Sequence, residues 1–167
     1  MQSRPVFLIA VLLLALLPAC AVHAPDAVPT VYIVRHAEKA DGKDPALSTA
    51  GAARAGALAA RLEGAGVTRI FSTDTLRTRS TAAPLAERLG LITEIYDHRQ
   101  PAKLVESIRS SGETVLVVGH SNTIAQIATA FGVDAGPAVR DDEYDRLYVI
   151  ALDAGGPAVQ ILRYGNP

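Results

Sequence analysis

The feature that most constrains the fold is the alternation of short β-branched apolar runs with segments of helical periodicity, which begins near Thr30. Apolar, β-branched runs of four to eight residues are typical of buried strands. Strands that alternate with helices favour βαβ units around a parallel sheet. We therefore predict an α/β fold, a three-layer α/β/α sandwich with a mainly parallel central sheet of about six strands. The strands are expected at residues 30–34, 69–72, 93–96, 114–118, 146–152 and 159–164.

Helical periodicity fills the segments between these strands. Apolar residues recur there with the spacing of one helix face, as expected for surface helices that pack on a sheet. Pro84 lies inside one segment and is expected to bend that helix or to mark its start. The helices are expected after Ser48, over residues 76–89, from Pro101 and from Asn122.

The first 19 residues differ from the rest of the chain. They contain one basic side chain, Arg4, followed by an unbroken apolar run over residues 6–17. This pattern is typical of a signal peptide, and as a helix the run would span roughly 18 Å, less than the hydrocarbon core of a bilayer. We interpret residues 1–19 as an export leader, 20–29 as an Ala/Pro-rich tether and 30–167 as one domain.

Residues 17–20, Leu-Pro-Ala-Cys, resemble the lipobox of bacterial lipoproteins, in which the cysteine becomes the lipidated first residue. Cys20 is the single cysteine of the chain, so no internal disulfide can form. Cleavage after Ala24 is an alternative, although it would leave Pro25 directly after the cut bond. We expect export to the periplasm or cell envelope and anchoring to the membrane through Cys20, with ordinary export or a cytosolic location as alternatives.

The composition excludes two broad classes of protein. Of the 167 residues, 49% are hydrophobic, and the formal net charge is −1. A balanced charge gives no sequence-independent attraction to nucleic acid, and so much apolar surface can build a packed core. We therefore predict a globular domain that does not bind nucleic acid.

Basic and imidazole side chains follow three predicted strands, at Arg35 and His36, within residues 74–79, and at His120. Because the carboxyl ends of parallel strands meet at one sheet edge, these groups are expected to line one crevice. Guanidinium groups donate forked hydrogen bonds to phosphate, and a neutral imidazole can attack phosphorus. The sequence therefore predicts a phosphate site, to which Lys39 could add a further charge.

Three motifs in order resemble those of the histidine phosphatase superfamily, in its phosphoglycerate-mutase-like branch. Arg35-His36-Ala37 is similar to the family's Arg-His-Gly/Ala motif, and Gly119-His120 to its late Gly-His pair. Residues 72–82, STDTLRTRSTA, resemble its Ser-x-x-x-x-Arg-x-x-x-Thr-Ala element, which selects Arg77 rather than Arg79 as the second phosphate arginine. The resemblance covers residues 30–164 and includes the Leu-Ser-x-x-Gly-x-x-Arg-Ala segment at 47–55.

The resemblance implies that His36 accepts the phosphoryl group as a phosphohistidine, which water then hydrolyses. His120, Arg35 and Arg77 would hold the phosphoryl oxygens, where they stabilise the charge of the transition state. Lys39 is either a further substrate contact or a solvent-facing charge.

The leaving group also needs a proton, and for this role the resemblance offers less guidance. Asp97, at the end of the strand predicted over 93–96, is our candidate general acid. His98 and Glu38 are alternatives, and Asp97 could instead form a turn or cap a helix.

Other phosphate and metal chemistries fit less well. His36-Ala37-Glu38 imitates the His-x-Glu of zinc deaminases, but the Pro-Cys-x-x-Cys that must follow is missing. No Gly-x-x-x-x-Gly-Lys-Ser/Thr loop occurs, and the acidic residues 141–145 lack EF-hand spacing, so we interpret them as a solvated turn. We predict neither a metal ion nor a nucleotide cofactor.

These observations predict a metal-independent phosphatase that hydrolyses phosphomonoesters of a small molecule or a phosphoprotein. Hydrolysis is favoured over mutase transfer because little sequence between residues 96 and 114 is left to build a lid, and because the leader moves the protein away from cytosolic glycolysis. A protein phosphohistidine phosphatase and a non-catalytic, anion-binding lipoprotein are the alternatives.

Overall fold

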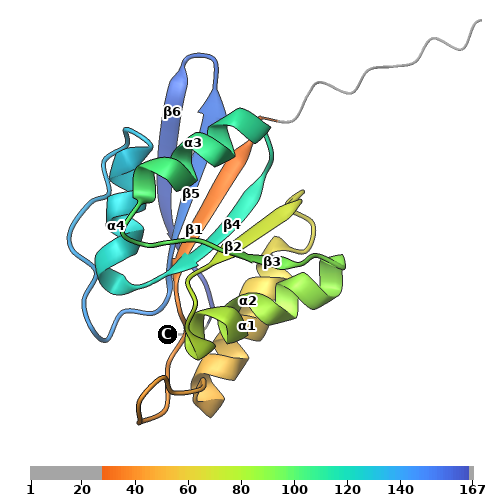
Figure 1. Cartoon of the computed structure of the whole chain (residues 1–167), viewed down its shortest axis with the longest axis vertical. Helices are drawn as coiled ribbons and strands as arrows, with labels where there is room; N and C mark the ends of the chain where they lie inside the picture. Colours follow the sequence, from red (N-terminus) through yellow and green to blue (C-terminus); the bar gives the residue numbers. More distant parts are fainter. Residues whose placement is uncertain (1–27, 166–167) are drawn as a thin grey trace, which may run out of the picture.

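The computed structural model describes residues 28–165, in which helices cover both faces of a six-stranded sheet (Figure 1). The predicted leader, the first part of the tether and Cys20 lie outside the described residues. Among residues 28–165, no helix is both long and apolar enough to cross a membrane.

The strand order of the sheet is β3-β2-β4-β1-β5-β6. The first four strands in this order run parallel to one another, whereas β5 is antiparallel to β1 and β6 is antiparallel to β5. The mainly parallel sheet predicted from the alternating pattern is therefore confirmed. The strands are β1 (Thr30–Arg35), β2 (Arg69–Ser72), β3 (Thr93–Ile95), β4 (Val115–Gly119), β5 (Arg146–Asp153) and β6 (Gly156–Arg163).

Two helices pack on each face of the sheet, and the side-chain alternation of the central strands matches this division. Val115 and Val117 of β4 belong to the core under α3 and α4, whereas Leu116 and Val118 belong to the core under α1 and α2. Strands buried on both faces read as continuous apolar runs, which is the pattern the sequence shows. The helices are α1 (Thr49–Leu62), α2 (Leu76–Leu89), α3 (Pro101–Ser111) and α4 (Ser121–Ala130).

The start of α1 packs tightly against the chain that follows β1. Ser48 caps the helix by accepting a hydrogen bond from the backbone N–H of Gly51. A Cβ at Gly51 would lie 2.0 Å from the carbonyl oxygen of Glu38, so only glycine fits there. This contact fixes α1 beside the segment that carries His36.

The predicted element ends differ from the observed ones at turns. Helix α2 continues through Pro84 from its start at Leu76. Strand β6 begins at Gly156 rather than residue 159, because a tight turn pairs Asp153 with Gly156 and extends the β5–β6 ladder. Because the Gly-Gly-Pro sequence of that turn is typical of a loop, it did not predict that the strand starts as early as Gly156.

Candidate active site

The site lies at the carboxyl ends of β1, β2 and β4. The register pairs Arg35 with Gly119, and the backbone N–H of His36 continues this pairing by donating to the carbonyl oxygen of Gly119 at 2.9 Å. The imidazoles that follow the two strands therefore become neighbours, and the ring centroids of His36 and His120 are 5.4 Å apart.

His36 is buried, with 4% of its surface exposed. Its Nδ1 atom lies 2.8 Å from the carbonyl oxygen of Ala37, which can only accept, so Nδ1 carries the proton and Nε2 is left with a free electron pair. Burial lowers the pKa of His36 to about 4; the hydrogen bond to Ala37 opposes this shift, and the charges of Arg35 and Arg77 add to it. The ring is therefore neutral at pH 7 and suited to nucleophilic attack.

His120 is held in the opposite tautomer. Its Nε2 atom lies 2.9 Å from the hydroxyl of Thr73, which itself donates to Thr78, so Nε2 is the donor. The Nδ1 atom then accepts from Arg77, whose Nη2 is 3.5 Å away. Burial, followed by the charge of Arg77, lowers the pKa of His120 to about 4.

Arg77 belongs to the first turn of α2 and reaches the site, whereas Arg79 does not. The Nη1 atom of Arg77 is 3.6 Å from a carboxylate oxygen of Asp44, and its Nε is buried with no hydrogen-bond partner among residues 28–165. Arg79 instead pairs with Asp74 on the surface. A buried donor without a partner is costly, so Arg77 is poised to bind an anion.

Among residues 28–165, the guanidinium of Arg35 is hydrogen-bonded through Nη1 but not through Nε. Its Nη1 donates to the carbonyl oxygens of Arg140, Asp141 and Glu143 at 2.9, 2.9 and 3.1 Å. The guanidinium carbon lies 4.2 Å from the ring centroid of Tyr144, whose ring is also 6.0 Å from that of His36. The Nε of Arg35 is buried and has no partner within the described part of the chain.

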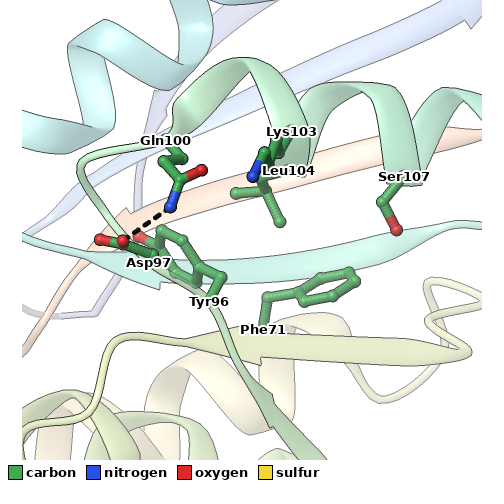
Figure 2. A pocket seen from close by; sticks show the side chains of 7 residues that line it. All are labelled: Phe71, Tyr96, Asp97, Gln100, Lys103, Leu104 and Ser107. Atoms are coloured by element: carbon green, nitrogen blue, oxygen red, sulfur yellow. Dashed lines mark hydrogen bonds between the residues drawn. The ribbon is translucent and has the colours of Figure 1, made fainter.

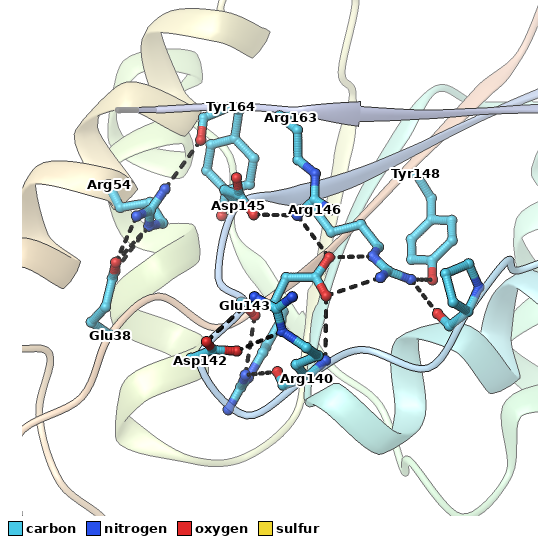
Figure 3. A network of polar contacts seen from close by, with 12 residues as sticks. Glu38, Arg54, Arg140, Asp142, Glu143, Asp145, Arg146, Tyr148, Arg163 and Tyr164 are labelled. Atoms are coloured by element: carbon cyan, nitrogen blue, oxygen red, sulfur yellow. Dashed lines mark hydrogen bonds and ion pairs between the residues drawn. The ribbon is translucent and has the colours of Figure 1, made fainter. Parts of the chain in front are cut away.

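The acidic residues 141–145 are not simply a solvated turn, which corrects our interpretation of the sequence. Asp141 and Asp142 are exposed, but Glu143 is buried and binds Arg146 at 2.6 Å (Figure 3). Arg163 also contacts Glu143, at 2.7 Å. These ion pairs anchor the loop whose carbonyl groups hold the guanidinium of Arg35.

A pocket of about 410 Å³ opens over His36, Arg77 and His120, whereas Arg35 lies outside its lining. Helix α4 begins directly after His120, so its first backbone N–H groups lie at the pocket, an arrangement suited to an anion. Lys39 is exposed at the pocket wall. The lining residues are His36, Lys39, Thr75, Arg77, His98, His120, Ser121, Asn122 and Thr123.

The three candidate acids occupy different places. Asp97 lies outside the pocket that contains His36 and accepts hydrogen bonds from the side chains of Arg99 and Gln100, which hold its pKa well below the usual range. His98 lines the pocket, with its ring centroid 6.3 Å from that of His120.

Glu38 lies outside the lining of the pocket and is committed to the packing of α1. Arg54 binds its carboxylate at 2.7 Å and donates to the carbonyl oxygen of Tyr164 at 3.1 Å (Figure 3). Burial raises the pKa of Glu38, but the hydrogen bond from Arg54, a backbone hydrogen bond and the charge of Arg54 together outweigh it, so the net shift is downward. Among residues 28–165, no group of three or more His, Cys, Asp or Glu side chains is arranged to hold a metal ion.

Three neighbours of the site, Thr73, Tyr144 and Asp44, were not predicted from the sequence. Thr73 lies at the end of β2 inside a motif already noted, so its position was a usable signal. Tyr144 and Asp44 come from loops, and no local pattern indicates that they approach Arg35 and Arg77.

Comparisons with known proteins concern the family and the fold. The sequence model of the histidine phosphatase superfamily (branch 1) matches residues 31–100, which include His36 and Arg77. No curated protein gives a significant match. Among solved structures, mycobacterial glucosyl-3-phosphoglycerate phosphatase is 14% identical, with a TM-score of 0.66, covering 84% of this chain and all of that one.

Two further solved structures share the fold. The protein histidine phosphatase SixA is 18% identical with a TM-score of 0.65, and YhfR from Bacillus stearothermophilus is 18% identical with a TM-score of 0.66. Each match covers 80% of this chain and 96% of the other. The family model thus matches less than half of the chain, and the solved structures show that the fold is shared.

Proposed function

We propose that this protein is a metal-independent phosphatase that hydrolyses phosphomonoesters through a phosphohistidine on His36. One observation carries the proposal: a buried, neutral His36 has Nε2 unprotonated, and the positive charges of Arg35 and Arg77 act on its ring. A nucleophile with cationic groups around it is what phosphoryl transfer requires.

The first step is attack on phosphorus by Nε2 of His36. The P–N bond forms, the bond from phosphorus to the leaving oxygen breaks, and that oxygen takes a proton. The hydrogen bond from Nδ1 to the carbonyl of Ala37 stabilises the positive charge that develops on the ring. Arg35 and Arg77 bind the phosphoryl oxygens, where charge is spread in a loose transition state. His120 positions Arg77, because its Nε2–H donates to Thr73 and its Nδ1 accepts from the guanidinium.

The second step is attack by water on the phosphohistidine. The P–O bond forms, the P–N bond breaks and inorganic phosphate leaves, while the proton released by water returns to the group that protonated the leaving oxygen. Of the three candidate acids we propose His98, since it is the one of the three that lines the pocket of His36. The ion pairs of Asp97 and Glu38 keep both carboxylates charged and engaged elsewhere.

The test is hydrolysis of 4-nitrophenyl phosphate by the purified protein with and without EDTA, together with a His36→Ala variant. We expect activity that EDTA leaves unchanged and that the variant lacks. Activity that EDTA abolishes, or that survives in the variant, would overturn the proposed mechanism. Phosphate binding without any turnover would favour a non-catalytic, anion-binding protein.

A phosphohistidine on a protein is a second candidate substrate. The open mouth of the pocket favours it, because Lys39, His98 and Asn122 are exposed there and would admit a protein-borne group. Comparing kcat/KM for a phosphohistidine peptide and for an aryl phosphate distinguishes the two substrates.

We also propose that the protein is exported and anchored to the membrane through a lipidated Cys20. The basic residue and apolar run of the leader and the Leu-Pro-Ala-Cys segment support this proposal.

A further inference from the structure

The pocket around His36 is the first of three adjoining pockets, which together we call the groove. It shares His98 and His120 with a neighbouring pocket of about 450 Å³. That second pocket shares Tyr96 and Asp97 with a third, of about 220 Å³, which lies between β2 and α3. The groove therefore runs from the imidazoles, past the chain that follows β3, to the first turns of α3.

The far end of the groove has apolar walls (Figure 2). Phe71 from β2, Tyr96 after β3 and Leu104 from α3 form what we call the apolar subsite, with Lys103 and Ser107 at its rim. An apolar cavity of roughly 150 Å³ is enough to bind benzene. The apolar subsite therefore has room for an aromatic ring or a short alkyl chain.

The walls of the apolar subsite are already in place. Phe71 and Leu104 are each 5% exposed and Tyr96 is 9% exposed, because all three also pack in the core under α3 and α4. A preformed wall binds a ligand without the entropy cost of ordering its side chains.

Asp97 stands where the middle pocket meets the apolar subsite, and its charge is already satisfied. Its carboxylate binds Arg99 at 3.0 Å and Gln100 at 2.9 Å, the latter bond drawn in Figure 2. The junction therefore does not require a cationic ligand. The groove is cationic at one end and apolar at the other, which matches an elongated molecule with a phosphate at one end.

We infer that the apolar subsite binds the leaving group of the substrate, and that this leaving group carries an aromatic or alkyl moiety several bonds from phosphorus. The inference rests on the proposed function, because that function places the phosphoryl group at His36. The substrate class is thus an amphiphilic phosphomonoester rather than a small, fully polar one.

The test measures binding of non-hydrolysable 4-alkylphenylphosphonates, with tails from methyl to hexyl, by calorimetry. We expect affinity to rise roughly fourfold for each methylene that the subsite buries. A Ser107→Trp variant fills the subsite from its rim and should abolish this rise while binding the methyl compound as the parent does. Glu106→Trp, the neighbouring exposed position outside the pocket lining, is the matched control and should keep the rise.

Equal affinity along the series in the parent, or a rise that Ser107→Trp retains, would overturn the inference. Hydrolysis of the matching 4-alkylphenyl phosphates tests the proposed function separately, because the tail hardly changes the acidity of the phenol. A rise in binding without turnover supports the apolar subsite and rejects the phosphatase. Turnover with no rise in affinity along the series supports the phosphatase and rejects the apolar subsite.

Discussion

The Nδ1 atom of His36 donates to the carbonyl oxygen of Ala37 over 2.8 Å, and this bond determines which nitrogen of the ring can react. The backbone N–H of Ala37 is held in turn by the hydroxyl of Thr81 at 2.9 Å. Helix α2, which carries Thr81 and Arg77, thereby fixes the backbone beside His36 as well as the position of Arg77. The orientation of His36 is thus built into the packing of α2 on the sheet.

Replacing His36 with Asn should lower kcat by roughly three orders of magnitude or more, because no other group at the site offers an unprotonated nitrogen in this position. Circular dichroism should show an unchanged fold. In the parent, mass spectrometry of an acid-free quench should find a phosphoryl group on the peptide that contains His36. Turnover by the variant within tenfold of the parent would rule out the phosphohistidine mechanism.

Arg77 and Arg79 form a matched pair for testing the phosphate site. Lysine lacks the planar fork of arginine, so Arg77→Lys should weaken inhibition by inorganic phosphate roughly tenfold. Arg79→Lys should change it less than about twofold, since Arg79 makes an exposed ion pair with Asp74. The opposite result would show that α2 presents a different arginine to the substrate.

Most of the fold follows from hydrophobic periodicity, because strands buried on both faces and one-sided helices leave strong patterns. The bounds of β2 and α2 match the prediction at both ends, since a serine and a left-handed Gly90 mark clear boundaries. The site follows from topology, which brings the ends of β1, β2 and β4 together.

What the sequence could not supply is the partner of each charged side chain. Asp97 lies at a strand end, as a catalytic acid would, yet Arg99 two residues later engages its carboxylate. Glu143 belongs to an acidic run that resembles a solvated turn, yet its pairing with Arg146 buries it. Such pairings depend on loop geometry, which has no periodic signal.

Thr73 orients His120, and its hydroxyl can be removed with little change in shape. Thr73→Val should leave Nε2 of His120 without its acceptor and lower kcat/KM roughly tenfold, the scale expected for a lost orienting hydrogen bond. Thr73→Ser keeps the hydroxyl and should restore activity. If kcat/KM falls equally in the valine and serine variants, the loss comes from packing rather than from the hydrogen bond to His120.

Cys20 is expected to anchor the protein, so Cys20→Ser should move it from the membrane fraction to the soluble fraction of the cell envelope. The exchange replaces one sulfur by oxygen and removes the thiol that a lipid would modify. Cell fractionation and metabolic labelling with a fatty acid measure the effect. An unchanged distribution would instead favour ordinary export or a cytosolic location.

The two buried imidazoles should make stability depend on pH. Burial lowers the pKa of both His36 and His120 from 6.5 to about 4, so between these values the unfolded chain binds more protons than the folded one. The free energy of unfolding should therefore fall as the pH drops from 6.5 toward 4, and the His36→Asn variant should show a shallower fall. Imidazole NMR resonances of the parent, assigned with variants at both positions, should titrate near pH 4. Titration of either ring near 6.5 would mean that the site admits enough water to charge it, which would contradict a neutral nucleophile sheltered by burial.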